Sequence, residues 1–295
     1  MTKAVLESLN MDSGYGEDFI SWNDDTALSL GKEVLQKIHL PHEDFADANF
    51  DKNVETEARQ IFLLLSTPRS GSTAICDYLY KKTNLVTHEY FQPFQYMPVL
   101  AYRWQSVKDG YLDPERYAKG LLKHRISENG TLGINLHGSH IGIFSYFEKY
   151  LSSLPKFVLV IRRRNKVAQA VSYYIASHSK KWSSHFDAEN PLPSYSYEGI
   201  KSKLFSILQQ ELVIDFYLKE NAFFSQTIYY ESISSKGSQL EGIMAKQLGV
   251  DEINLQLAET QKQSDEINID YAEKFWKQLQ FGSRKYVREL QSGFS

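Results

Sequence analysis

The chain has 295 residues, 42% of them hydrophobic, which is enough to bury a sizeable core in one large α/β domain or in two smaller ones. Its 33 basic side chains nearly balance its 36 acidic ones. The net charge of -3 argues against a protein that coats nucleic acid, so any bound anion must be held by a local site. A lone cysteine, Cys76, excludes an internal disulfide and a cysteine-based zinc site.

The N-terminus lacks the basic end and apolar core of a signal peptide, and the longest apolar stretches are only strand-length. We therefore expect a cytoplasmic protein without a membrane span and without a nucleic-acid partner. Residues 1–55 are acidic and aromatic and show no clear periodicity. They are expected to form an N-terminal extension, whose role stays open, before a main domain of residues 56–295.

The predicted elements of the main domain alternate between strands and helices. Short apolar runs predict strands at residues 61–66, 131–136, 156–161 and 227–230. Helices are expected at 73–82, from Asp113 and Pro114 to about 129–130, at 141–151, from Asn165 onward, and at 197–219. Strands separated by helices imply parallel pairing. We predict an α/β fold with a P-loop-type doubly wound, mostly parallel sheet flanked by helices.

The octapeptide STPRSGST, residues 66–73, follows the first predicted strand. Ligands of such folds bind beyond the carboxyl ends of strands, where the N-terminus of a helix offers unpaired N–H groups to an anion. The glycine lets the backbone approach the anion, the hydroxyl groups donate hydrogen bonds, and the arginine adds a forked cation. The candidate anion ligands are Pro68, Arg69, Ser70, Gly71, Ser72 and Thr73.

This loop departs from the Walker pattern of nucleoside triphosphatases. The first glycine is missing, and Arg69 precedes Gly71 where the Walker form has a lysine after the glycine. Without the arrangement that holds magnesium, the loop is better suited to a sulfuryl group, which carries less charge than a phosphoryl group. We expect metal-independent transfer and no metal site.

A basic turn follows the strand at 156–161, with three consecutive arginines, Arg162 to Arg164. Ser172 lies eight residues after Arg164, which returns to nearly the same face of a helix. One ligand phosphate could be held by an arginine of this turn, Arg163 or Arg164, together with the Ser172 hydroxyl. The alternative at this point is a solvated basic turn with a serine that packs.

Together these segments resemble the sulfotransferases that use 3′-phosphoadenosine 5′-phosphosulfate (PAPS), and the resemblance is closest to the bacterial NodH-like and trehalose 2-sulfotransferase family. Residues 67–73, the Glu-Tyr-Phe segment at 89–91 and the helix opening at 165–172 carry the resemblance. Residues 230–231 and 261–265 are also similar to family segments. The resemblance spans roughly residues 61–275.

The resemblance implies that PAPS donates a sulfuryl group to a hydroxyl of an acceptor, a carbohydrate or glycolipid, leaving 3′-phosphoadenosine 5′-phosphate. Arg69 would stabilise the departing phosphate, and Glu89 would be the base that accepts the hydroxyl proton. His88 is the nearest alternative base, followed by His137 with His140 nearby. The resemblance is also consistent with a homodimer.

Two positions depart from the family pattern. Asn135 stands where lysine is common, and Asn165 replaces the usual aspartate. Two alternative functions stay open at this point: a P-loop kinase that uses ATP, and a noncatalytic nucleotide-binding protein, which the Asn135 departure makes conceivable. The acceptor and the position sulfated are not determined by the sequence.

Overall fold

The structure, a computed structural model, describes residues 44–52, 56–151, 154–183, 188–233, 239–249 and 266–292, together with residues 35, 36, 38 and 40. The segment at 261–265, which carries part of the family resemblance, lies outside the described residues. A search of the described helices finds none with the length and apolar character needed to cross a membrane.

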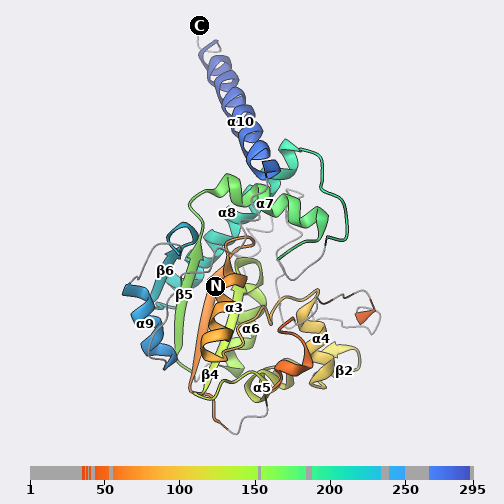
Figure 1. The fold of residues 1–295 in the computed structure, drawn as a ribbon, viewed down its shortest axis with the longest axis vertical. Coiled ribbons are helices and arrows are strands. Elements are labelled where there is room, and N and C mark those ends of the chain that lie inside the picture. Colours follow the sequence, from red (N-terminus) through yellow and green to blue (C-terminus); the bar gives the residue numbers. More distant parts are fainter. Residues whose placement is uncertain are drawn as a thin grey trace.

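A parallel sheet of four strands forms the centre of the described chain (Figure 1). Its order is β4-β1-β5-β6, and every neighbouring pair is parallel. The strands span β1 Gln60–Ser66, β4 Thr131–His137, β5 Lys156–Arg162 and β6 Ser225–Tyr229. The four predicted strands and the parallel doubly wound sheet are therefore confirmed.

The order of the strands determines where a ligand site is expected. From β1 the chain crosses to β4 on one side and then returns to β5 on the other, so the direction of winding reverses between β1 and β5. The crevice outside the carboxyl ends of two such strands is the usual ligand site of doubly wound folds. In the register of β1 and β4, the last residue of β1, Ser66, lies opposite His137.

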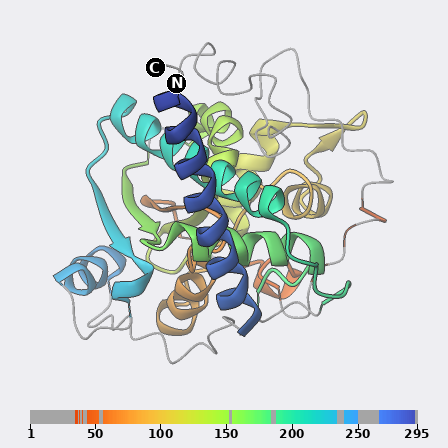
Figure 2. The same ribbon diagram turned by 90° about the horizontal axis from the view of Figure 1, so that it is seen from above.

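Helices cover both faces of this sheet (Figures 1 and 2). The described helices are α3 Ser72–Thr83, α4 Tyr96–Arg103, α5 Pro114–His124, α6 Ile141–Phe147, α7 Lys166–Ser179, α8 Tyr197–Glu220, α9 Gln239–Leu248 and α10 Glu266–Ser292. Short 3-10 helices are η2 Ala48–Phe50, η3 Gly138–His140, η4 Glu148–Tyr150 and η5 Tyr230–Ser232. A small hairpin, β2 Val107–Lys108 and β3 Tyr111–Leu112, lies apart from the main sheet. Figure 1 shows α10 extending away from the body of the protein.

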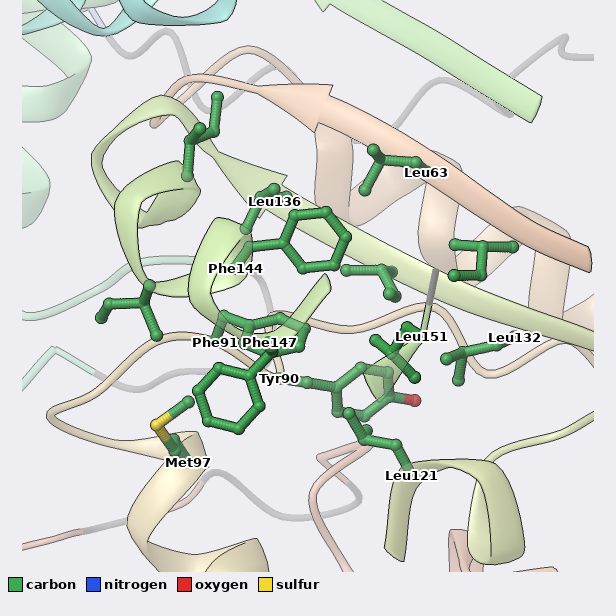
Figure 3. Packing of buried hydrophobic residues seen from close by; sticks show 14 of the residues in the cluster. Leu63, Tyr90, Phe91, Met97, Leu121, Leu132, Leu136, Phe144, Phe147 and Leu151 are labelled. Atoms are coloured by element: carbon green, nitrogen blue, oxygen red, sulfur yellow. The ribbon is translucent and has the colours of Figure 1, made fainter. Parts of the chain in front are cut away.

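Alternate side chains of the strands enter two different cores, as the two-residue period of a strand requires. Leu63 of β1 packs with residues of α4, α5, α6 and α8, whereas Leu64 packs with residues of α3 and α9. Figure 3 shows the first core, in which the rings of Phe91, Phe144 and Phe147 lie together. A third cluster joins α7, α8 and α10. Both faces of the sheet are thus buried, which explains the continuous apolar runs of the strands.

The helix starts predicted at Asp113 and Asn165 are confirmed, and both residues are N-caps. The side chain of Asp113 accepts a hydrogen bond from the backbone N–H of Arg116, and that of Asn165 accepts one from Ala168. One predicted helix end is wrong, because α5 ends at His124 and not near residues 129–130. The chain turns there because Ile126 forms a bridge to Leu132. The helix predicted at 141–151 is α6 followed by η4.

Residues 44–52 of the predicted extension pack against the main domain. Ala46 is fully buried in the first core. The buried guanidinium of Arg125 donates hydrogen bonds to the carbonyl oxygens of Phe45 and Asp47 and to the Asp51 carboxylate. The boundary at residue 55 stays a prediction, but residues 44–52 are not an isolated appendage.

Candidate active site

The loop between β1 and α3 contains the predicted anion ligands. No side chain caps the N-terminus of α3, so its first backbone N–H groups are left to an anion or to water. The hydroxyl of Ser70 is buried and has no hydrogen-bond partner. Pro68 and Ser72 are buried, and Thr73 is exposed. The unsatisfied Ser70 hydroxyl is the feature expected of a loop that surrounds an anion.

Gly71 is fixed by a contact that the sequence did not predict. Its φ is 96°, and a Cβ at this position would lie 2.6 Å from Cδ2 of Tyr230. Both features require glycine. The guanidinium of Arg163 lies over the same Tyr230 ring, 4.8 Å from its centroid. Tyr230, directly after the edge strand β6, therefore connects the anion loop to the basic turn.

The side chain of Arg69 joins the loop to α7. Its backbone has a positive φ of 62°. Its Nε donates a hydrogen bond of 2.9 Å to Oγ of Ser172, and its Nη1 donates to the carbonyl oxygen of Trp182. Burial, and secondly the nearby Arg163 cation, lower the pKa of Arg69 to about 10. Arg69 is therefore a cation at neutral pH. Arg69 and Ser172, which were predicted to bind different anionic groups of one ligand, lie in contact with each other.

The three consecutive arginines have different partners. Arg162 forms an ion pair with Asp215 of α8. Arg163 donates a hydrogen bond of 3.2 Å to the carbonyl oxygen of Arg69, and its buried Nε has no partner. Arg164 lies over the ring of Tyr229, 4.4 Å from its centroid. Of the three arginines, Arg163 thus contacts the anion loop directly. Arg164 lies beside Tyr229 at the end of β6, the edge strand of the sheet.

Two residues that the sequence reasoning did not select hold these segments in place. Nε2 of the buried Gln169 donates hydrogen bonds of 2.8 Å to Oγ1 of Thr67 and to the carbonyl oxygen of Pro68. The carboxylate of Glu231 accepts the backbone N–H groups of Arg164 and Asn165. Glu231 belongs to a segment that resembles the family, which was the available signal.

The charge of Glu231 follows from these contacts. Burial acts to raise the pKa of its carboxyl group, but the backbone N–H donors and the Arg163 cation outweigh burial, so the pKa is lowered. The carboxylate is therefore ionised at neutral pH and orients the basic turn.

The predicted base Glu89 lies beside the carboxyl end of β4. His88 forms a parallel bridge to Ile134, and its carbonyl oxygen accepts the N–H of Asn135. Side chains of consecutive residues in such an extended segment point to opposite sides. His88 accordingly faces Asp44, 3.3 Å from its carboxylate, whereas Glu89 lies 3.5 Å from Nδ1 of His137.

The second alternative base, His137 with His140, belongs to the same group as Glu89. The two imidazole rings lie 5.8 Å apart with an angle of 20° between their planes. Possible ligand atoms of Glu89, His137 and His140 all lie within 4.8 Å of one another, the one such group found among the described residues. Burial, and secondly His137, lower the pKa of His140 to about 3, so that its ring is neutral at pH 7.

Asn135, where the family commonly has lysine, has a structural partner. Its Oδ1 accepts a hydrogen bond of 2.9 Å from Oγ of Ser66, the residue that ends β1. Asn135 therefore fastens the start of the anion loop to β4 in place of any contact that a lysine would make.

A cavity of about 80 Å³ adjoins the loop and α7. Arg69 and Ser172 line it, with Ile175, Ala176 and Ser179 of α7. The two residues that share this hydrogen bond, Arg69 and Ser172, thus both border the cavity.

Two comparisons with known proteins bear on this geometry. A search of curated proteins found no significant match. A family model described as Stf0 sulphotransferase matches residues 61–278, which include the four strands of the sheet except Gln60 at the start of β1, together with the anion loop, the basic turn and Glu89. The chain belongs to the Stf0 sulfotransferase family, the family of the NodH-like and trehalose 2-sulfotransferases.

Proposed function

We propose that the protein transfers a sulfuryl group from PAPS to a hydroxyl of a carbohydrate or glycolipid, leaving 3′-phosphoadenosine 5′-phosphate. One observation carries the proposal. The anion loop after β1 and the Glu89–His137 pair beside β4 lie at the carboxyl ends of two adjacent strands whose register places Ser66 opposite His137. A cationic donor site and a proton acceptor are thus neighbours, as group transfer to a hydroxyl requires.

The residues of the loop and the basic turn fit a ligand with two anionic groups. The buried Ser70 hydroxyl and the buried Nε of Arg163 both have no partner, so each has a hydrogen bond to offer. We assign the phosphosulfate to residues 68–73 with Arg163 adjoining, and the 3′-phosphate to Arg164 and Ser172. In this structure Ser172 accepts a hydrogen bond from Arg69. When PAPS binds, this bond is replaced by hydrogen bonds from the two side chains to the ligand.

Each residue then has a defined step in the chemistry. Glu89 accepts the proton of the acceptor hydroxyl, whose oxygen attacks the sulfur in line with the bridging oxygen. As the new S–O bond forms and the bond to the bridging oxygen breaks, Arg69 stabilises the negative charge that develops on the departing phosphate. No protein group has to form a covalent bond, and magnesium is not required.

The geometry supports Glu89 over His88 as the base. His88 is buried against Tyr96, with ring centroids 4.2 Å apart, and faces Asp44. The Glu89 side chain is 19% exposed and faces His137, so a substrate can reach it.

The acceptor is assigned from the family and from aromatic side chains that follow Glu89. Of these, Phe91 and Tyr96 belong to the core, whereas Phe94 is 61% exposed. An exposed ring can pack on the C–H face of a sugar, so Phe94 is the aromatic residue that we propose for the acceptor. The homodimer and the cytoplasmic location remain predictions.

The deciding experiment is to incubate the protein with radiolabelled PAPS, without added metal, and with a panel of sugars, glycolipids and cell extract. We expect label to move to a carbohydrate-containing acceptor, and we expect Arg69→Ala and Glu89→Gln to abolish the transfer while the circular dichroism spectrum is unchanged. Magnesium-dependent transfer from ATP, without binding of 3′-phosphoadenosine 5′-phosphate, would show a kinase instead. Full transfer by both variants would reject the assigned roles.

A further inference from the structure

The group formed by Glu89, His137 and His140 contains more than proton transfer needs. The proposed base requires Glu89, with His137 beside it. His140 lies behind them, and only 9% of its surface is exposed. Its imidazole nevertheless lies close enough that one ligand atom from each of the three residues falls within 4.8 Å of the other two.

We propose that Glu89, His137 and His140 form a binding site for a divalent transition metal ion, with Zn²⁺ as the favoured ion. Two imidazoles and one carboxylate are a ligand set that proteins use for zinc, with a fourth position open to water. Hard cations such as Mg²⁺ and Ca²⁺ prefer oxygen ligands only, so the two histidines disfavour them.

The distances suit this ion after a small closing movement. Bonds of about 2.0 Å in a tetrahedral arrangement place neighbouring ligand atoms roughly 3.3 Å apart. Nδ1 of His137 and Oε2 of Glu89 are already 3.5 Å apart. With His140 included, one ligand atom from each of the three residues lies within 4.8 Å of the other two.

The backbone that carries the three ligands is firmly held. His137 ends β4 in register with Ser66, and the carbonyl oxygen of His88 pairs with Asn135, which fixes the segment leading to Glu89. Gly138 packs so tightly on α8 that a Cβ would lie 2.4 Å from the carbonyl oxygen of Gln210. The ligands therefore need to adjust only their side chains.

The site is open on one side. The side chains of Glu89 and His137 are 19% and 13% exposed, so an ion can enter past them and keep its fourth position toward solvent. That position faces the place where we assign the acceptor hydroxyl. A carboxylate bound to Zn²⁺ no longer accepts a proton readily, so Zn²⁺ should inhibit sulfuryl transfer. This consequence, unlike the binding itself, rests on the proposed function.

Binding is tested on the full-length, tag-free protein after treatment with a chelator. Calorimetric titration with Zn²⁺, and the visible absorption of Co²⁺ as a probe of tetrahedral geometry, should both show one ion per chain. His140→Gln should weaken binding about 10- to 100-fold or more, since loss of a ligand costs at least as much as loss of a supporting contact. His178→Gln, which alters an exposed histidine on α7, should bind like the wild type.

Because His140 is buried, a second variant guards against loss of folding. His137→Gln should weaken binding in the same way, and thermal melts identify any unfolded variant. The proposal is overturned if the wild type shows no saturable binding, or if folded His140→Gln and His137→Gln bind Zn²⁺ as tightly as the wild type.

Activity measurements separate this proposal from the proposed function. Zn²⁺ should inhibit transfer by the wild type and by His178→Gln. It should inhibit His140→Gln only at about 10- to 100-fold higher concentration, with inhibition measured relative to the metal-free rate of each protein. If the ion binds at these residues but does not inhibit transfer, the metal site stands and Glu89 is not the base. If no transfer from PAPS occurs at all, the binding data still decide whether the site exists.

Discussion

The buried cation Arg125 offers a sharp test of how residues 44–52 are held. Its side chain is 0% exposed and lies 2.7 Å from the Asp51 carboxylate. It also donates to the carbonyl oxygens of Phe45 and Asp47 and lies 5.8 Å and 5.6 Å from the ring centroids of Tyr90 and Trp104. Arg125→Met keeps an unbranched apolar side chain between the two rings but removes every donor.

We expect this variant to lose about 3–5 kcal/mol of unfolding free energy, because the Asp51 carboxylate loses its shortest cationic contact and keeps the longer contacts with Trp104 and Arg103. Two backbone carbonyl oxygens also lose a partner. For a chain of this size the loss corresponds to a fall in melting temperature of roughly 6–20 °C. Urea unfolding measured by circular dichroism gives the free energy, and limited proteolysis reports whether residues 44–52 detach.

The matched control uses the same carboxylate. Arg103 also contacts Asp51, at 3.5 Å, but its side chain is 25% exposed. Arg103→Met should therefore cost less than about 1 kcal/mol, as partly exposed ion pairs do. If the two variants lose equal stability, or if Arg125→Met stays within about 1 kcal/mol of the wild type, the buried cation does not hold this segment.

Three further predictions concern the anion loop and its surroundings. Gly71→Ala should lose about 1–3 kcal/mol more unfolding free energy than Gly110→Ala. Both glycines have a positive φ, but only at Gly71 would the added Cβ collide with a side chain, that of Tyr230. Equal losses would leave the backbone conformation as the sole reason for glycine at position 71. Arg164→Ala should weaken binding of 3′-phosphoadenosine 5′-phosphate about 10- to 100-fold and should barely change the affinity for adenosine 5′-phosphate. The control Arg162→Ala, whose ion-pair partner lies on α8, should change neither affinity. Equal losses for both ligands would remove Arg164 from the 3′-phosphate site. Glu231→Gln should be less stable than the wild type at pH 7. The difference in unfolding free energy should shrink as the pH falls below 4.5, because the carboxyl group of the unfolded chain binds a proton at a higher pH than that of the folded chain. A pH-independent difference in urea unfolding would contradict this.

Local patterns predicted the sheet and the anion loop well. A buried parallel strand needs apolar side chains on both faces, so continuous runs such as 156–161 are readable without the rest of the fold. The loop is equally local, because it lies between a strand and the helix that follows directly. Membership of the sulfotransferase family agrees with what these segments resembled.

Residues whose partners are distant in the chain were harder to predict. Gln169 contacts a loop about 100 positions earlier, and although residues 165–172 resemble the family, no pattern in this helix points to that contact. Arginine is normally exposed, so Arg125 gave no sign of being buried. The opposite directions of His88 and Glu89 follow from pairing with Ile134, which a single sequence does not reveal. For the same reason the sequence did not predict that His140 lies beside both His137 and Glu89, since this group forms only in the folded chain.

The pairing of Ser66 with His137 has a consequence for how new specificities can arise. Adjacent strands are held about 4.8 Å apart by their backbone hydrogen bonds. The spacing between the anion loop after β1 and the Glu89–His137 pair beside β4 is therefore set by the sheet. The segment around Phe94 is not part of that ladder. On the proposed function, insertions or substitutions there can change which acceptor is bound while the distance over which the sulfuryl group travels stays the same. The choice of acceptor and the geometry of sulfuryl transfer can then change independently of each other during evolution.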